Sequence, residues 1–187
     1  MARRSVQVTQ KRILSAEERE ELLRDCWYYH DARWYAEVAH SIGHEVANRL
    51  NARAARSLGK AEMRRLVARL GVQRPSTIEE LVSLLETARD VFLPPPLMKI
   101  HFHVVDDSSY EMEVEECFVA RNAVKTRMAR HHVCAVPDRI VGWHEALGVP
   151  LRRRSPARSC TLVRGLGCRP RFEVMWTKVG RDGTGGG

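Results

Sequence analysis

The sequence lacks any long apolar run. No stretch approaches the roughly 20 consecutive apolar residues of a membrane-spanning helix, and residues 1–5 lead into polar Gln and Lys rather than an apolar signal region. It also contains no serine-nucleophile elbow, phosphate loop, dinucleotide fingerprint or zinc-protease motif. These absences exclude several enzyme classes and predict a cytoplasmic protein without a membrane partner.

Lysine is scarce. Of the 31 basic residues only 5 are Lys, and the formal net charge is +8. Such an excess can bind phosphates by releasing counterions, and the densest basic stretches are 121–132 and 152–158. Because the arginines are otherwise spread along the chain without a nucleic-acid-binding motif, nucleic acid is a disfavoured partner. A basic, non-enzymatic module that binds nucleic acid or an acidic partner remains the alternative interpretation.

Aromatic residues are also few, at 6% of the chain, yet five of the twelve lie within residues 26–35. On a helix, Trp27 and Trp34 share a face with His30 or Asp31, so a polar pair would lie between two indoles. Apolar walls around a few polar groups are typical of a small-ligand pocket, with Trp27 and Trp34 as ligand-binding residues. The alternative is a core helix in which His30 and Asp31 satisfy each other or the backbone.

The periodicity predicts helices followed by a small sheet. Ser15, followed by the acidic Glu17 and Glu18, marks a helix start, and apolar residues then recur at helical spacing through residue 50, in a stripe that we expect to be buried. Gly43 is a break point. Further helices are expected over 60–70, ended by Gly71, and from a capping box at 76–80 through Ala88 to the stop at Pro94–Pro96.

After Pro94–Pro96 the period changes to two over 100–104 and 110–114, which predicts a β-hairpin. For both apolar sets to share one face the loop must be odd, so we expect the three residues 107–109. Short helices are expected over 122–130 and 139–147, then a second hairpin from strands 159–163 and 170–176. The fold class is therefore α+β: an N-terminal helical layer packed on a small antiparallel β-sheet with two hairpins. One domain spans 15–177, with flexible termini at 1–14 and 180–187.

Cysteine is the sharpest chemical signal. In the cytosol the five thiols would stay reduced. Four of them, Cys117, Cys134, Cys160 and Cys168, fall at a strand end, between two helices, and on both sides of the last turn. An antiparallel sheet could bring them to one edge, where thiolates would hold zinc or, as the weaker alternative, an iron–sulfur cluster. Their wide spacing leaves two other interpretations open, which are core thiols and a reactive thiol.

Histidines add weaker candidates. His131 and His132 lie beside Cys134, where they could supply a ligand or a base. The alternative is that they are exposed residues favoured by a helix C-terminus. His40 and His44 are one helical turn apart, which can hold a metal, but without a third ligand such residues are commonly solvated.

Residues 26–70, with Trp27, His30-Asp31, Trp34-Tyr35, Asn48-x-x-Asn51, Leu58-Gly59 and Leu70-Gly71, resemble an uncharacterised family of small prokaryotic proteins that looks related to the aminothiazoline-carboxylate hydrolases. The resemblance continues through the four later cysteines to Phe172. It implies a helical layer with an antiparallel sheet and the binding of a small ligand or metal ion. The chain departs from the family pattern in its His40/His44 pair and in lacking a further Cys near Cys160.

The resemblance also implies an activity. Ring-opening hydrolysis of a small cyclic amidine-like substrate needs an activated water, and His30 with Asp31 would be the base and its orienting partner. The sequence thus predicts a small-ligand or metal-binding protein, with hydrolysis resting on the resemblance alone. Zinc is the expected cofactor.

Overall fold

The helices begin and end at residues that the sequence marks. The computed structural model describes residues 13–154 and 159–176. Helix α1 (Ala16–Ile42) starts with a capping box between Ser15 and Glu18, and Gly43, at φ 92°, separates it from α2 (His44–Leu70). The helix expected over 60–70 is the last part of α2, which ends at Gly71 in the left-handed conformation. Helix α3 (Ile78–Phe92) is capped by Thr77.

The expected hairpin is present. Strands β1 (Met98–Asp106) and β2 (Ser109–Cys117) pair antiparallel, with Phe102 opposite Met112. The two apolar sets share one face, which is buried except at Val104, but the turn is the two residues 107–108, not three. A bulge between Val104 and Asp106 supplies the missing residue and restores the register.

The C-terminal part differs from the expectation in the position of its first helix, which spans 118–125 rather than 122–130, and in two strands. Helices α4 (Phe118–Lys125) and α5 (Val136–Leu147) precede β3 (Leu151–Arg154), the short 3₁₀ helix η1 (Leu162–Arg164) and β4 (Arg171–Val174). The strand predicted over 159–163 is wrong, because that segment turns into η1. Strand β4 instead lies between β2 and β3, in the order β1-β2-β4-β3, with every pairing antiparallel.

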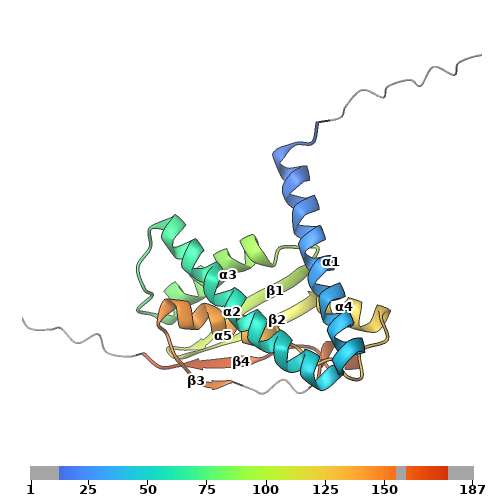
Figure 1. Ribbon diagram of the computed structural model, residues 1–187. Helices are drawn as coiled ribbons and strands as arrows, with labels where there is room; N and C mark the ends of the chain where they lie inside the picture. The colour runs from blue at the N-terminus through green and yellow to red at the C-terminus, as the bar shows by residue number, and fades with distance from the viewer. Residues whose placement is uncertain (1–12, 155–158, 177–187) are drawn as a thin grey trace, which may run out of the picture.

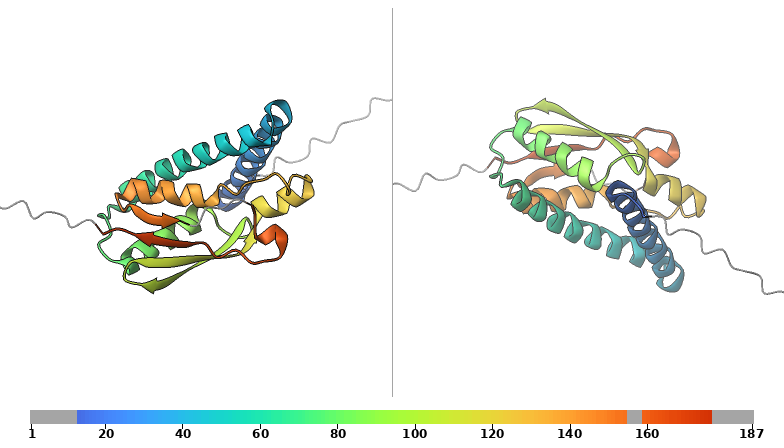
Figure 2. Two further views of the ribbon diagram at one scale, coloured as in Figure 1. Left: turned by 90° about the horizontal axis from the view of Figure 1, so that it is seen from below. Right: turned by 90° about the horizontal axis from the view of Figure 1, so that it is seen from above.

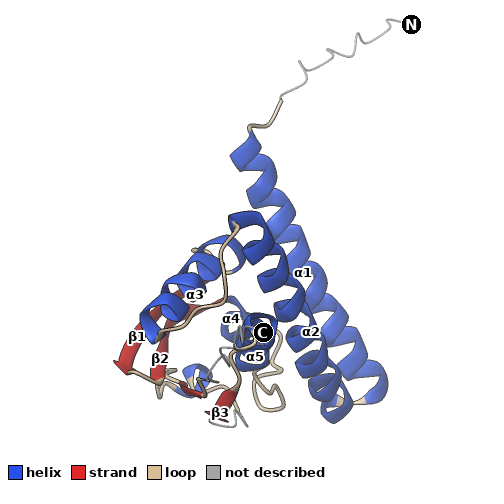
Figure 3. Cartoon of the chain, turned by 90° about the vertical axis from the view of Figure 1, so that its left-hand side faces the viewer, coloured by secondary structure: helices blue, strands red, loops and turns tan. Residues whose placement is uncertain are grey.

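The helices cover one face of the sheet (Figures 1 and 2). Helices α3 and α5 pack near the strands, and α2 lies along α5 (Figure 3). The opposite face carries cross-strand polar pairs, among them His103 with Glu113 at 3.1 Å and His101 with Glu115 at 3.2 Å. The structure is thus an α+β fold with its core between the sheet and one helical layer.

The burial predicted for the apolar stripe along α1 is wrong. The stripe was expected to be buried, but Leu23, Trp27 and Trp34 are 70%, 59% and 65% exposed. Tyr28, Ala32, Tyr35 and Ala39 face the body instead, and the first turns of α1 extend beyond it (Figure 1). A second face of α1, made of small and hydroxylated residues, recurs at the same helical spacing. The periodicity therefore could not indicate which of the two faces is buried.

No helix in the described part of the chain is long and apolar enough to cross a membrane. Residues 1–12 and 180–187 of the expected flexible termini, and 155–158 of the basic stretch 152–158, lie outside the described residues.

Candidate functional site: two adjoining cavities

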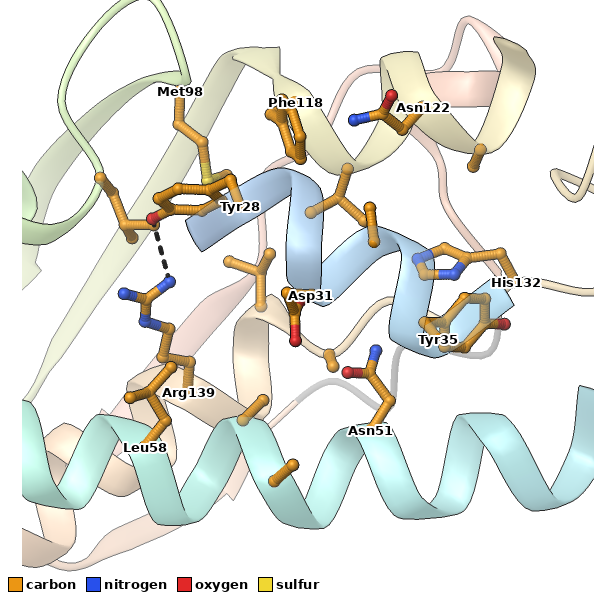
Figure 4. Close-up of a pocket in the computed structure, with 18 of the residues that line it drawn as sticks. Tyr28, Asp31, Tyr35, Asn51, Leu58, Met98, Phe118, Asn122, His132 and Arg139 are labelled. Carbon is orange, nitrogen blue, oxygen red and sulfur yellow. Dashed lines mark hydrogen bonds between the residues drawn. The ribbon is translucent and has the colours of Figure 1, made fainter. Parts of the chain in front are cut away.

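A cavity of about 270 Å³ lies between α1, α2, α4 and the segment 128–139; we call it the helix cavity (Figure 4). Its walls are mainly apolar, contributed by Ala54, Ala55, Leu58, Leu93, Met98, Phe118, Val119, Ala123, Met128, Ala135 and Val136. The polar side chains that reach it are Asp31, Tyr35, Asn51, Asn122, Thr126, His132 and Arg139. A mostly apolar wall with a few polar groups is typical of a small-molecule site.

One end of the helix cavity is built on a buried ion pair. The Arg139 guanidinium donates from Nε to Glu62 Oε2 at 2.9 Å and from Nη2 to Glu62 Oε1. It also donates to the Tyr28 hydroxyl at 3.2 Å, and that hydroxyl donates to the Phe92 carbonyl. Trp143 Nε1 adds a donor to Glu62 at 3.0 Å. Burial raises the pKa of Tyr28, so the hydroxyl keeps its proton at neutral pH.

The other end is formed by His132 and Tyr35, whose rings meet edge to face with centroids 5.3 Å apart. The loop that carries His132 is fixed by Asn48, which donates to the His131 carbonyl at 2.7 Å and accepts from the Val133 N–H at 3.0 Å. His132 is only 6% exposed, and its Nε2 has no hydrogen-bond partner among the described residues. Burial lowers the pKa of His132, so the imidazole is neutral at neutral pH.

The predicted aromatic site is only partly assembled. Trp27 and Asp31 line the helix cavity, and burial of its carboxyl raises the pKa of Asp31, opposed by Arg139 and His30. His30 and Trp34 are exposed and do not line it; the His30 ring stacks on Trp27 at 6.4 Å. The polar pair therefore does not sit between two indoles, because Trp34 points away from the body. The roles assigned to His30, Asp31, Trp27 and Trp34 stay predictions.

A second cavity, of about 580 Å³, brings the four predicted cysteines together; we call it the cysteine cavity. Cys117 ends β2, Cys134 lies between α4 and α5, and Cys160 and Cys168 flank η1. Two thioethers, Met98 and Met112, complete a set of six sulfur-bearing side chains on its wall. The placement of all four cysteines along one edge follows from where the strands and helices end.

Three thiols of the cysteine cavity, those of Cys117, Cys134 and Cys168, are not activated in the way of a nucleophile. Burial raises the pKa of Cys117 to about 11 and of Cys134 to about 12, and it also raises that of Cys168. These three thiols are therefore protonated at neutral pH. Within residues 13–154 and 159–176, no three His, Cys, Asp or Glu side chains are grouped so as to hold a metal ion.

The two cavities adjoin. Met98 and Val136 line both of them, so these two side chains form a common wall. The cysteine cavity and the helix cavity thus share part of their apolar lining.

No family model matches the chain, and no curated protein matches it. Among solved structures it is similar to a trafficking protein particle complex subunit 3 from Naegleria fowleri covalently bound to palmitic acid, with a TM-score of 0.55 and 11% identity over 85% of this chain and 96% of that one. The likeness shows the fold alone.

Sequence reasoning missed several residues of the helix cavity. Arg139 and Glu62 are 77 positions apart, and nothing in the spacing pairs them. His131 and His132 were interpreted either as a ligand or base beside Cys134 or as two exposed residues; His131 is exposed, whereas His132 is buried on the wall of the helix cavity. Asn51 lay in the family-like motif but received no role. The one available signal was the aromatic cluster over 26–35, which does contribute Trp27, Tyr28 and Tyr35 to the wall.

Proposed function

We propose that the protein binds a small, mostly apolar molecule in the helix cavity. The observation that carries this proposal is the cavity itself: about 270 Å³ of space with apolar walls and polar groups at its ends. It exceeds the ~150 Å³ of an engineered apolar cavity that binds benzene. Closing such a space would have favoured the fold by burying more apolar surface, so keeping it open indicates a guest.

The similar fold from Naegleria supports the same proposal, because that protein carries a palmitic acid. An apolar guest of this chemistry would gain roughly 25 cal/mol for each Å² of apolar surface removed from water. In the helix cavity, Phe118, Leu58 and Val119 would provide that contact.

The test is displacement of a neutral fluorescent probe, N-phenyl-1-naphthylamine, by decanol. Ala55→Phe places a large ring in the cavity and should weaken decanol binding by about tenfold or more. Ala68→Phe is the matched control, since Ala68 is exposed on the same helix and does not line the cavity. Equal affinities in the two folded variants, or no binding by wild type, would count against the proposal.

A second function, zinc binding by Cys117, Cys134, Cys160 and Cys168, is favoured by their convergence on one cavity. Four sulfur donors from separate segments suit a tetrahedral structural site, although the thiols would have to close around the ion. Thiolate bonds to such an ion would cross-link the end of β2, the 134 loop and the η1 segment. Because burial raises the pKa of Cys117 and Cys134, binding should release protons, and the metal should be retained less well as pH falls.

The measurement is the metal content of protein purified without chelators. Wild type should retain stoichiometric zinc, and Cys134→Ser and Cys168→Ser should lose it. Cys26→Ser is the control, since Cys26 is exposed on α1 and lies outside the cysteine cavity. If wild type is purified without metal and does not retain added zinc, the zinc proposal is wrong and the four cysteines are core thiols.

Ring-opening hydrolysis stays a prediction from the resemblance. Asp31 reaches the helix cavity, whereas His30 is exposed outside it. An unchanged rate in His30→Ala would remove His30 from the reaction, and no ring opening by wild type would end the hypothesis.

A further inference from the structure

The charges around the helix cavity do not balance. The Arg139 guanidinium is held by Glu62 through two nitrogens and donates its other bonds to the Tyr28 hydroxyl and the Phe92 carbonyl. Its charge is thereby compensated and its donors are nearly all used. The Asp31 carboxylate, in contrast, makes no hydrogen bond or ion pair with another residue of the described part of the chain.

The Asp31 carboxylate lies on the wall of the helix cavity at an exposed position of α1, so water solvates it when the cavity is empty. It points toward the apolar space between α1 and α2 (Figure 4), where Arg139 and His30 act on it only from a distance. A guest that covered Asp31 would remove its charge from water, and a charge-assisted hydrogen bond from the guest would offset that cost. A guest of the helix cavity therefore needs a cationic or hydrogen-donating group for Asp31.

A second polar group of the cavity wall, His132, has a ring nitrogen without a hydrogen-bond partner among the described residues. His132 Nε2 is buried and unpaired on the cavity wall, at the end opposite Arg139. Buried polar groups are normally hydrogen-bonded, so an exception in a cavity wall indicates a polar atom of the guest. The neutral imidazole adds no positive charge that could satisfy Asp31.

We propose that the ligand of the helix cavity is an amphiphilic amine, with its protonated amino group against the Asp31 carboxylate and a second hydrogen-bonding group at His132. This inference rests on the proposed function and specifies the chemistry of the same site. The apolar part of the guest lies along Phe118, Val119 and Leu58. A free fatty acid is disfavoured there, because its carboxylate would meet Asp31, a like charge.

The overall charge of the protein makes this selectivity diagnostic. With a formal net charge of +8, non-specific attraction favours anions over cations. A preference for an amine must therefore come from a local carboxylate. Salt would weaken the non-specific attraction more than a partly buried pair.

The experiment compares decylamine, decanol and decanoate, which share one alkyl chain and differ in head group, in the probe-displacement assay at neutral pH. Decylamine should bind wild type about tenfold tighter than decanol, and decanoate should bind weakest. Asp31→Asn should reduce the affinity for decylamine to that for decanol while leaving decanol unchanged. Glu37→Gln, an equal charge change at an exposed position of α1 outside the cavity, should leave the amine preference intact.

The His132 contact is tested with the ω-amino alcohols of hexane, octane and decane. At least one should bind wild type several-fold tighter than the matching amine, and His132→Leu should remove that gain but keep the amine preference. Asp31→Ala provides a second removal of the carboxylate if Asp31→Asn fails to fold.

The outcomes separate this inference from the proposed function. Equal binding of amine and alcohol, tightest binding of decanoate, or an amine preference that survives Asp31→Asn would overturn the assignment of an amine. Decanol binding that Ala55→Phe abolishes would still support the apolar site in each of those cases. Absence of decanol and decylamine binding would overturn both.

Discussion

Helices α2 and α5 cross with their backbones in contact, and this crossing predicts that Gly142→Ala destabilises the fold. A Cβ on Gly142 would lie 2.1 Å from the Arg56 carbonyl oxygen and 2.8 Å from the Lys60 nitrogen. The reciprocal position, Gly59, would place a Cβ 2.1 Å from the Arg139 carbonyl oxygen. These neighbours are main-chain atoms, which cannot rotate aside as a side chain can.

The magnitude follows from two opposing effects. In a free helix, Gly→Ala stabilises by about 1 kcal/mol because alanine restricts the unfolded chain and suits the helix. Overpacking a core costs about 1–3 kcal/mol, and backbone overlap belongs at the upper end of that range. Separating the helices would also loosen the contacts of the buried Trp143 and Met63. We therefore expect Gly142→Ala to lower the free energy of unfolding by about 2 kcal/mol.

Urea denaturation followed by far-ultraviolet circular dichroism measures this change. Ser57→Ala, at an exposed position of α2, controls for helix propensity and should be neutral or slightly stabilising. A Gly142→Ala protein that is about 1 kcal/mol more stable than wild type, as in a free helix, would refute the close crossing.

Two further predictions concern buried polar groups. Burial lowers the pKa of His144 from 6.5 to about 4, so the neutral imidazole, hydrogen-bonded to the Tyr110 hydroxyl at 2.6 Å, stabilises the fold above pH 6.5, and this contribution is lost as pH falls toward 4. Urea titrations should show roughly 3 kcal/mol less stability across that window and a flatter profile in His144→Gln; a flat wild-type profile would contradict the assignment. Glu62→Gln should cost about 3 kcal/mol because it leaves Arg139 buried without its carboxylate, whereas Glu145→Gln, in an exposed pair, should cost under about 1 kcal/mol; equal losses would refute the difference.

The parts of the fold that local chemistry determines were predictable from the sequence. The Ser15 cap, the break at Gly43, the stop at Gly71 and the alternation over 100–104 each depend on a few neighbouring residues. The two-residue turn at 107–108 was not predictable from the sequence, because the β-bulge that changes the strand register leaves no pattern there. The strand at 151–154 was missed because its consecutive arginines lack the apolar alternation that indicates a strand. It pairs with β4.

The site was less predictable, since it is assembled from distant segments. The cysteines could be placed because each lies at the end of an element, and ends of antiparallel strands gather at the sheet edges. Arg139, Glu62 and His132 could not be placed, because their roles depend on how α2 packs against α5 and on the loop before α5. The expectation that Trp34 is buried was wrong for the same reason, because only the packing of α1 decides which of its two faces is buried.

Both ends of the helix cavity are held by contacts that need no ligand. The Gly59–Gly142 crossing fixes the first turn of α5 and with it Arg139, while Asn48 fixes the loop that carries His132. A site fixed in this way loses little conformational entropy when a guest enters, so its binding energy is not spent on ordering the protein. In such a site, a substitution can change ligand affinity without changing the stability of the fold. Asp31→Asn should therefore change ligand affinity while leaving the free energy of unfolding of the ligand-free protein close to wild type. Glu62→Gln should lower both, because it removes the anchor of Arg139.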